Sequence, residues 1–136
     1  MTTKIRRKPQ ITIAKTESAR LLALAAALAE RNPELSDTMF GELERARVVT
    51  DDAVAGNVVR MGSVVTYQPD GDEPRTVTLV YPGNADIDQA RISVATPVGV
   101  ALIGLSPGQS MAWTARDGRS HELTVLAVHS PEAVLP

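Results

Sequence analysis

The chain has 136 residues, which is enough for one ordinary domain or two very small ones. Hydrophobic residues make up 43% of it and charged residues 22%, proportions that are typical of globular proteins and exclude a disordered or collagen-like chain. The formal net charge of −2 provides no overall attraction to nucleic acid or to an anionic membrane. We therefore expect neither sequence-specific nucleic-acid binding nor membrane association.

The chain contains no cysteine, which excludes disulfide bonds and thiolate metal sites and suits the reducing cytoplasm. Its longest apolar run, residues 21–29, is about half of the roughly 20 residues needed to cross a bilayer. We therefore expect a cytoplasmic protein. Four basic residues near the start are interpreted as a solvated tail, with a nucleic-acid-binding arm as the alternative: Lys4, Arg6, Arg7 and Lys8.

The first predicted elements are a strand and a helix. Residues 10–14 alternate between polar and apolar side chains, which predicts a short edge strand. Thr16 is expected to be the N-cap of a helix, because its hydroxyl can accept a hydrogen bond from a free backbone N–H. Apolar residues then repeat at spacings of three and four, which predicts one hydrophobic helical face: Leu21, Leu24, Ala25 and Leu28.

A second helix is predicted after a short loop. Asn32 and Pro33 are expected to end the first helix, because the residue before a proline is disfavoured in the α conformation. The second helix is predicted to begin at Ser36 or Asp37, either of which can cap it. Two helices joined so closely must be nearly antiparallel, and we expect a short hairpin (coiled coil) with arms of about 12–15 residues, roughly 18–22 Å long. Its inner face is predicted to carry Met39, Phe40, Leu43 and Ala46 or Arg47.

The rest of the chain is typical of β-structure, because β-branched runs alternate with clusters of Gly, Pro and Asp. A short helix is predicted over residues 97–103, with Pro97 at its start and Gly104 after its end. The predicted fold is α+β: residues 1–55 form the leader, strand and helical hairpin, and residues 56–136 form a small antiparallel β domain with one short helix. The predicted strands cover residues 58–61, 63–68, 76–81, 92–94, 110–115 and 122–128.

No segment has the pattern of a catalytic or cofactor site. The acidic turn at residues 70–73 lacks the ligand spacing of a calcium loop, and Asp86 and Asp88 have no partner cluster. His121 and His129 are not spaced as a ligand pair, and they are interpreted as surface residues. Glycine-rich phosphate loops and nucleophile motifs are absent from the sequence. We therefore expect neither enzymatic activity nor a metal or cofactor held by this chain.

Two carboxylates at the tip of the predicted hairpin have two interpretations. Glu34 and Asp37 are three residues apart, and together they could present a Mg²⁺ ion to the site of a partner protein. In the simpler interpretation Asp37 caps the second helix and Glu34 lies in the loop before it.

Residues 78–105 carry the most specific pattern in the chain. The sequence ADI at residues 85–87, RISV at 91–94 and TPVGVALIG at 96–104 resembles the carboxyl-terminal domain of the Gre transcript-cleavage factors. The residues at 78–82, 95–105 and 42–46 are similar to the signatures of the Rnk family (regulator of nucleoside diphosphate kinase), which are Gre-like proteins with a shortened helical hairpin.

This resemblance implies an FKBP-like fold for residues 56–130. It also implies a non-enzymatic regulator of transcription elongation that docks on bacterial RNA polymerase at the rim of the secondary channel and competes there with Gre factors. The hairpin would point inward and act as a steric plug. The implied docking surface consists of Ala95, Thr96, Pro97, Val98 and Gly99.

Two other functions are open at this point. A cleavage-promoting factor would use Glu34 and Asp37 to share a Mg²⁺ ion at the polymerase active centre. However, arms of roughly 20 Å are shorter than that task requires of Gre coiled coils. A prolyl isomerase would need an aromatic-lined pocket, and the chain is only 3% aromatic. The sequence leaves the oligomeric state open.

Overall fold

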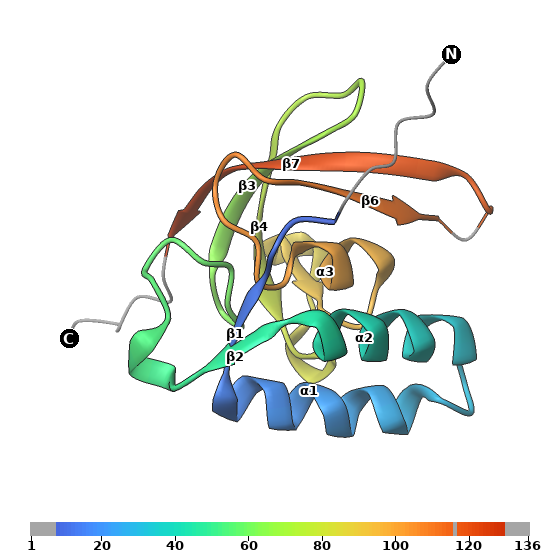
Figure 1. The fold of residues 1–136 in the computed structure, drawn as a ribbon. Coiled ribbons are helices and arrows are strands. Elements are labelled where there is room, and N and C mark those ends of the chain that lie inside the picture. Colours follow the sequence, from blue (N-terminus) through green and yellow to red (C-terminus); the bar gives the residue numbers. More distant parts are fainter. Residues whose placement is uncertain (1–7, 116, 130–136) are drawn as a thin grey trace, which may run out of the picture.

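The computed structural model describes residues 8–115 and 117–129, which form a mixed α+β fold with two long helices beside a curled sheet (Figure 1). No helix within the described residues is long and apolar enough to cross a membrane. The first elements are β1 (Thr12–Ala14), α1 (Lys15–Leu28), α2 (Pro33–Arg45) and β2 (Arg47–Val49). They are followed by β3 (Val64–Pro69), β4 (Arg75–Val80), β5 (Arg91–Ser93), α3 (Pro97–Leu102), β6 (Ser110–Thr114) and β7 (Ser120–His129).

The predicted cap of the first helix is wrong. Helix α1 begins at Lys15, and Ala14 occupies the cap position without a side-chain hydrogen bond. Thr16 lies in the first turn, where its backbone N–H and its hydroxyl donate to the two carboxylate oxygens of Asp51, at 3.1 and 2.5 Å. These bonds stabilise the ionised carboxylate and lower the pKa of Asp51 from 3.8. The start of α1 is therefore capped by a residue 35 positions away in the chain.

The predicted start of the second helix is also wrong. Helix α2 begins at Pro33, because proline needs no backbone donor at a first helical position. The side chain of Asn32 accepts a hydrogen bond from the backbone N–H of Leu35 at 3.2 Å and so caps the helix. Asp37 lies inside α2 and is not its cap. The Asn-Pro pair thus ends one helix and begins the next.

The ends of the hairpin meet in a pair of strands. Strand β1 is the predicted edge strand, and β2 pairs with it in parallel, with Thr12 opposite Arg47 and Ala14 opposite Val49. Strand β2 is not predicted from the sequence, because a three-residue strand directly after a helix gives almost no periodic signal.

The main sheet has five strands in the order β5-β4-β3-β7-β6. Its strand pairs are antiparallel as predicted, except that β5 runs parallel to β4. The strand predicted at residues 58–61 does not form. Instead, the backbone of Val59 donates to Leu105 at 2.8 Å and accepts from Gly104 at 3.0 Å, so this segment pairs with the turn after α3 rather than with the sheet.

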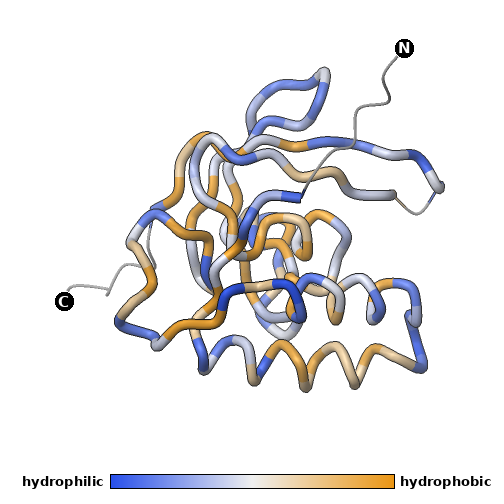
Figure 2. Tube along the Cα trace, viewed as in Figure 1, coloured by the Kyte–Doolittle hydropathy of each residue, from blue (hydrophilic) through white to orange (hydrophobic). Residues whose placement is uncertain are grey.

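One hydrophobic core joins the hairpin to the sheet, as the hydrophobic positions at the centre of Figure 2 indicate. Leu21 of α1 and Met39 of α2 are buried in the same cluster as Leu79 of β4 and Val100 of α3. The hairpin therefore lies along the rest of the chain (Figure 1). The inner faces of both helices are used for this packing.

Polar contacts fix α1 on the sheet side. The carboxylate of Glu17 accepts a hydrogen bond from the side chain of Arg60 at 3.2 Å and from the backbone N–H of Met61 at 3.3 Å. The guanidinium of Arg20 lies 3.9 Å from the centre of the Tyr81 ring, a cation–π contact. Burial raises the pKa of the Tyr81 hydroxyl above 10.0.

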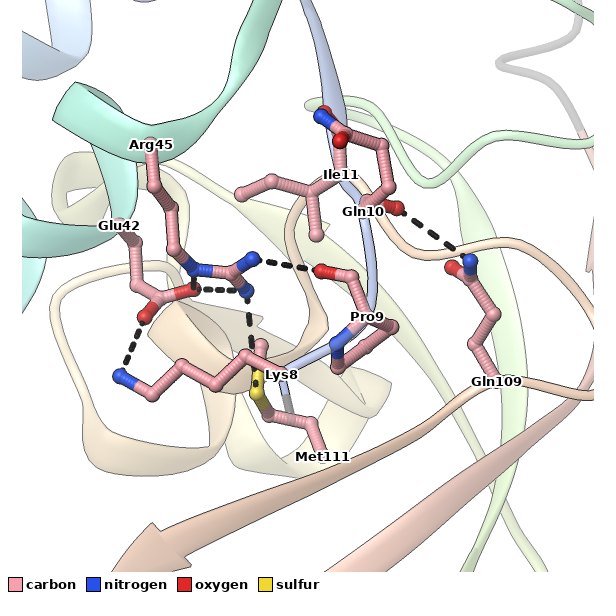
Figure 3. A network of polar contacts seen from close by, with 8 residues as sticks. All are labelled: Lys8, Pro9, Gln10, Ile11, Glu42, Arg45, Gln109 and Met111. Carbon is pink, nitrogen blue, oxygen red and sulfur yellow. Dashed lines mark hydrogen bonds and ion pairs between the residues drawn. The ribbon is translucent and has the colours of Figure 1, made fainter. Parts of the chain in front are cut away.

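A buried carboxylate fixes α2 (Figure 3). Glu42 is 4% exposed, and it accepts hydrogen bonds from Arg45 at 2.7 and 3.0 Å and from Lys8 at 3.0 Å. Arg45 also donates to the carbonyl of Pro9 and lies 3.9 Å from the sulfur of Met111 in β6. The network thus joins α2 to the chain before β1 and to the edge of the sheet. Of the four predicted leader residues, only Lys8 belongs to the described part of the chain.

Gly104 allows β1 to approach the turn after α3. It has a φ of +82°, and a Cβ atom there would lie 2.8 Å from the Cβ of Ile11. Its carbonyl accepts a hydrogen bond from the backbone N–H of Thr12 at 3.2 Å. Any side chain at position 104 would therefore push β1 away from the core.

We expect Gly104→Ala to lower the free energy of unfolding by about 1–3 kcal/mol, because it combines backbone strain with a collision against β1. Gly41→Ala is the matched control. Gly41 lies in α2 with open space around it, and alanine there should raise stability by about 0.5–1 kcal/mol. Urea unfolding followed by circular dichroism measures both. Equal effects of the two substitutions would contradict this account of Gly104.

We expect Glu42→Ala to lower the free energy of unfolding by about 1.5–3 kcal/mol, because it removes the acceptor of charge-assisted hydrogen bonds and leaves Arg45 without its carboxylate. Glu42→Gln keeps an acceptor oxygen of nearly the same shape and should lose less. The same urea experiment at neutral pH tests the pair. A loss by the alanine variant of less than about 0.5 kcal/mol, which is typical of an ordinary surface position, would show that the network is not structural.

Candidate functional site

A groove of about 570 Å³ lies between α2, the loop before α3 and the hairpin formed by β6 and β7. This volume is in the range of ligand pockets, which is about 300–1,000 Å³. The groove contains Glu34 and Thr38 of α2 on one side, and Ala112 and Thr114 of β6 on another. It is therefore the place where the helical hairpin and the sheet share an accessible surface.

The loop before α3 is held in one shape by its own hydrogen bonds. The hydroxyl of Thr96 donates to the carbonyl of Ser93 at 2.7 Å and accepts from the backbone N–H of Gly99 at 3.0 Å. The hydroxyl of Ser93 accepts from the backbone N–H of Ala95 at 2.9 Å. Thr96 is thus the N-cap of α3, and Pro97 follows at its first position.

Gly99 is required by close packing rather than by its backbone angles. A Cβ atom at this position would lie 2.3 Å from the carbonyl oxygen of Ser93 and 2.7 Å from the Cα of Val94. Gly99 is buried, whereas Ala95, Thr96 and Pro97 are partly exposed. Of the implied docking residues, Gly99 therefore shapes the loop and these three present a surface.

The structure brings only part of the predicted site together. Glu34 from the hairpin tip lines the same groove as Ala95, Thr96 and Pro97, a proximity that spacing in the sequence could not indicate. The lining does not include Val98, Gly99 or Asp37. Asp37 is exposed on α2, three residues beyond Glu34. Of the two tip acids, the groove lining therefore contains Glu34 alone.

The contribution of β6 to the groove was not predicted from the sequence. Trp113 lines the groove and stacks on His121 of β7, with ring centres 4.8 Å apart. Its indole nitrogen is buried and has no hydrogen-bond partner among the described residues. The single tryptophan of the chain was a signal for a binding surface, but only the tertiary structure places it in one groove with α2.

The chemistry of the groove is that of binding. Within the described residues, no group of three or more His, Cys, Asp or Glu side chains is placed to hold a metal ion. The groove instead offers the carboxylate of Glu34, the hydroxyls of Thr38 and Thr114, and apolar side chains such as Leu35. Glu42, the other acidic residue in the lining, is already paired with Lys8 and Arg45.

Comparisons with known proteins find a family match for each of the two parts of the chain. The family described as "Transcription elongation factor, GreA/GreB, C-term" matches residues 54–130, and the family described as "Rnk N-terminus" matches residues 9–49. The chain is 34% identical over 128 residues to the "Regulator of nucleoside diphosphate kinase" of Escherichia coli K12, which covers 93% of this chain and 94% of that protein.

Gre factors are also similar to this chain. The "Transcription elongation factor GreA" of Rhodospirillum rubrum is 37% identical over 84 residues, or 60% of this chain and 54% of that protein. A solved structure, the "Prokaryotic transcription elongation factor GreA/GreB from Nitrosomonas europaea", aligns with a TM-score of 0.70 and 32% identity over 90% of this chain and 99% of that one. With both of its parts matched in this way, the chain belongs to the Rnk family of regulators of nucleoside diphosphate kinase, a Gre-like family of transcription factors.

Proposed function

We propose that this chain is a non-enzymatic regulator of transcription elongation in the bacterial cytoplasm. It binds RNA polymerase at the rim of the secondary channel and competes there with Gre factors. In this proposal residues 56–136 form an FKBP-like domain of the Gre type, and residues 1–55 contain a shortened counterpart of the Gre coiled coil. The GreA/GreB match over residues 54–130 supports the choice of partner.

The observation that carries the proposal is the rigid loop before α3. Hydrogen bonds from Ser93 and Thr96, together with the close packing at Gly99, hold the loop in one shape. Ala95 and Pro97 are partly exposed on it. A surface that is already ordered loses little conformational entropy when a partner binds, which favours its use in docking.

The hairpin takes a different role from the inward plug that the sequence suggested. Its arms have 14 and 13 residues, or about 20 Å each, and their inner faces are buried in the core that they share with α3 and the sheet. The whole folded chain, rather than a projecting hairpin, would therefore lie at the channel entrance. Competition with Gre factors follows from shared occupancy of that rim and needs no reach toward the active centre.

The first test is binding to core RNA polymerase, with Gre factor as competitor. We expect Ala95→Arg, which places a bulky charge on the exposed loop, to weaken binding about tenfold or more. Ala23→Arg is the control, because Ala23 is exposed on α1 and does not line the groove. Fluorescence anisotropy of the labelled chain measures both. An absence of binding at micromolar concentration, with and without competitor, would refute the proposal.

The second test concerns the tip acids. We expect backtracked elongation complexes to keep their full-length transcripts in the presence of this chain and Mg²⁺, because Glu34 and Asp37 lie on a short hairpin whose inner face is buried in the core of the protein. The double variant Glu34→Ala/Asp37→Ala should behave like the parent. Transcript shortening by the parent that the double variant abolishes would instead establish the cleavage-promoting alternative.

A further inference from the structure

One edge of the main sheet is open where it borders the groove. β6 is the last strand in the sheet order, and it pairs with β7 in an antiparallel register. The backbone N–H of Ala115 donates to Arg119 at 2.9 Å, and that of Val125 donates to Gln109 at 3.0 Å. Because alternate residues of an antiparallel strand bond to the same neighbour, Ala112 must direct its N–H and C=O groups away from β7.

The same alternation applies to Thr114, two residues further along. Both residues are exposed, and both line the groove. No described residue forms a hydrogen bond with the backbone of Ala112 or Thr114 on this side. The groove wall thus carries a row of unpaired donors and acceptors with the spacing of a strand, which is a template for another extended chain.

We infer that the groove binds an extended polypeptide segment of a partner protein, which adds a strand to β6. Main-chain hydrogen bonds from Ala112 and Thr114 would hold the segment. Glu34 and Thr38 of α2 also line the groove, so a segment that pairs with β6 would lie beside this helix.

Side chains of the groove indicate what the segment carries. Leu35, Val100 and Met111 are buried residues in the lining, so they favour an apolar residue that points inward. The carboxylate of Glu34 is exposed and has no ion-pair partner among the described residues, whereas Glu42 is already neutralised. The segment therefore alternates apolar and polar residues and places a lysine or arginine near Glu34.

This inference goes beyond the proposed function. It identifies the ligand of the groove as an extended peptide that forms backbone hydrogen bonds with β6. The inference holds whether RNA polymerase or another protein supplies this peptide.

The test uses the full chain labelled with ¹⁵N and the peptide acetyl-Thr-Val-Lys-Val-Thr-amide at millimolar concentration. We expect the amide signals of Ala112 and Thr114 to shift and their hydrogen exchange to slow. Two further peptides carry N-methyl groups at the odd or at the even amides. Because an added strand uses only one of its edges, one methylated peptide should keep the binding of the parent and the other should lose it.

A charge reversal tests the role of Glu34. We expect Glu34→Lys to weaken binding of the lysine peptide about two- to five-fold and to favour a peptide with glutamate at the same position. Glu44→Lys is the control, since it makes the same charge change at an exposed position of α2 outside the groove lining.

Four outcomes would overturn the inference. They are no spectral change at millimolar peptide, shifts that map outside the groove, and equal binding by both methylated peptides. The fourth is a shift of the Ala112 amide that depends on protein concentration without peptide, because this would show that a second copy occupies the edge.

Discussion

The contact between β1 and Gly104 determines how the two parts of this chain are joined. The missing side chain at position 104 lets Ile11 pack against the turn after α3, and the carbonyl of Gly104 accepts from Thr12. β1 leads directly into α1, so this contact sets where the hairpin begins. Its return arm ends in β2, which pairs with β1. Both ends of the hairpin are therefore anchored at one place in the core.

Because both of its ends are anchored, the hairpin packs into the same core as the rest of the protein. Its inner face is buried with the sheet and α3, so separation of the hairpin would expose a large apolar surface to water. This packing makes α2 one wall of the groove. For the proposed function this matters, because Glu34 at the hairpin tip stays beside the loop before α3. This arrangement supports the proposed binding at the channel entrance of RNA polymerase rather than transcript cleavage at its active centre.

The two acidic residues of the groove differ because of their partners. Glu42 is buried, and its charge is matched by Arg45 and Lys8, so it stabilises the position of α2. Glu34 lies about two turns earlier in α2. It is exposed, and no described residue forms an ion pair with its carboxylate. The first carboxylate is committed to structure, and the second is available to a ligand. The difference arises from burial and proximity rather than from residue type.

The sequence alone determined the elements whose signal is local: the apolar spacing of α1 and α2, the β-branched strands, and the Thr-Pro start of α3. It misplaced both helix starts, since Asp51 reaches Thr16 from a distant turn and Asn32 proved a better cap than Ser36. Only the tertiary structure decided that Glu34, the loop at Ala95 and the open edge of β6 share one groove. Such proximity depends on the packing of residues far apart in the chain, which no local pattern records.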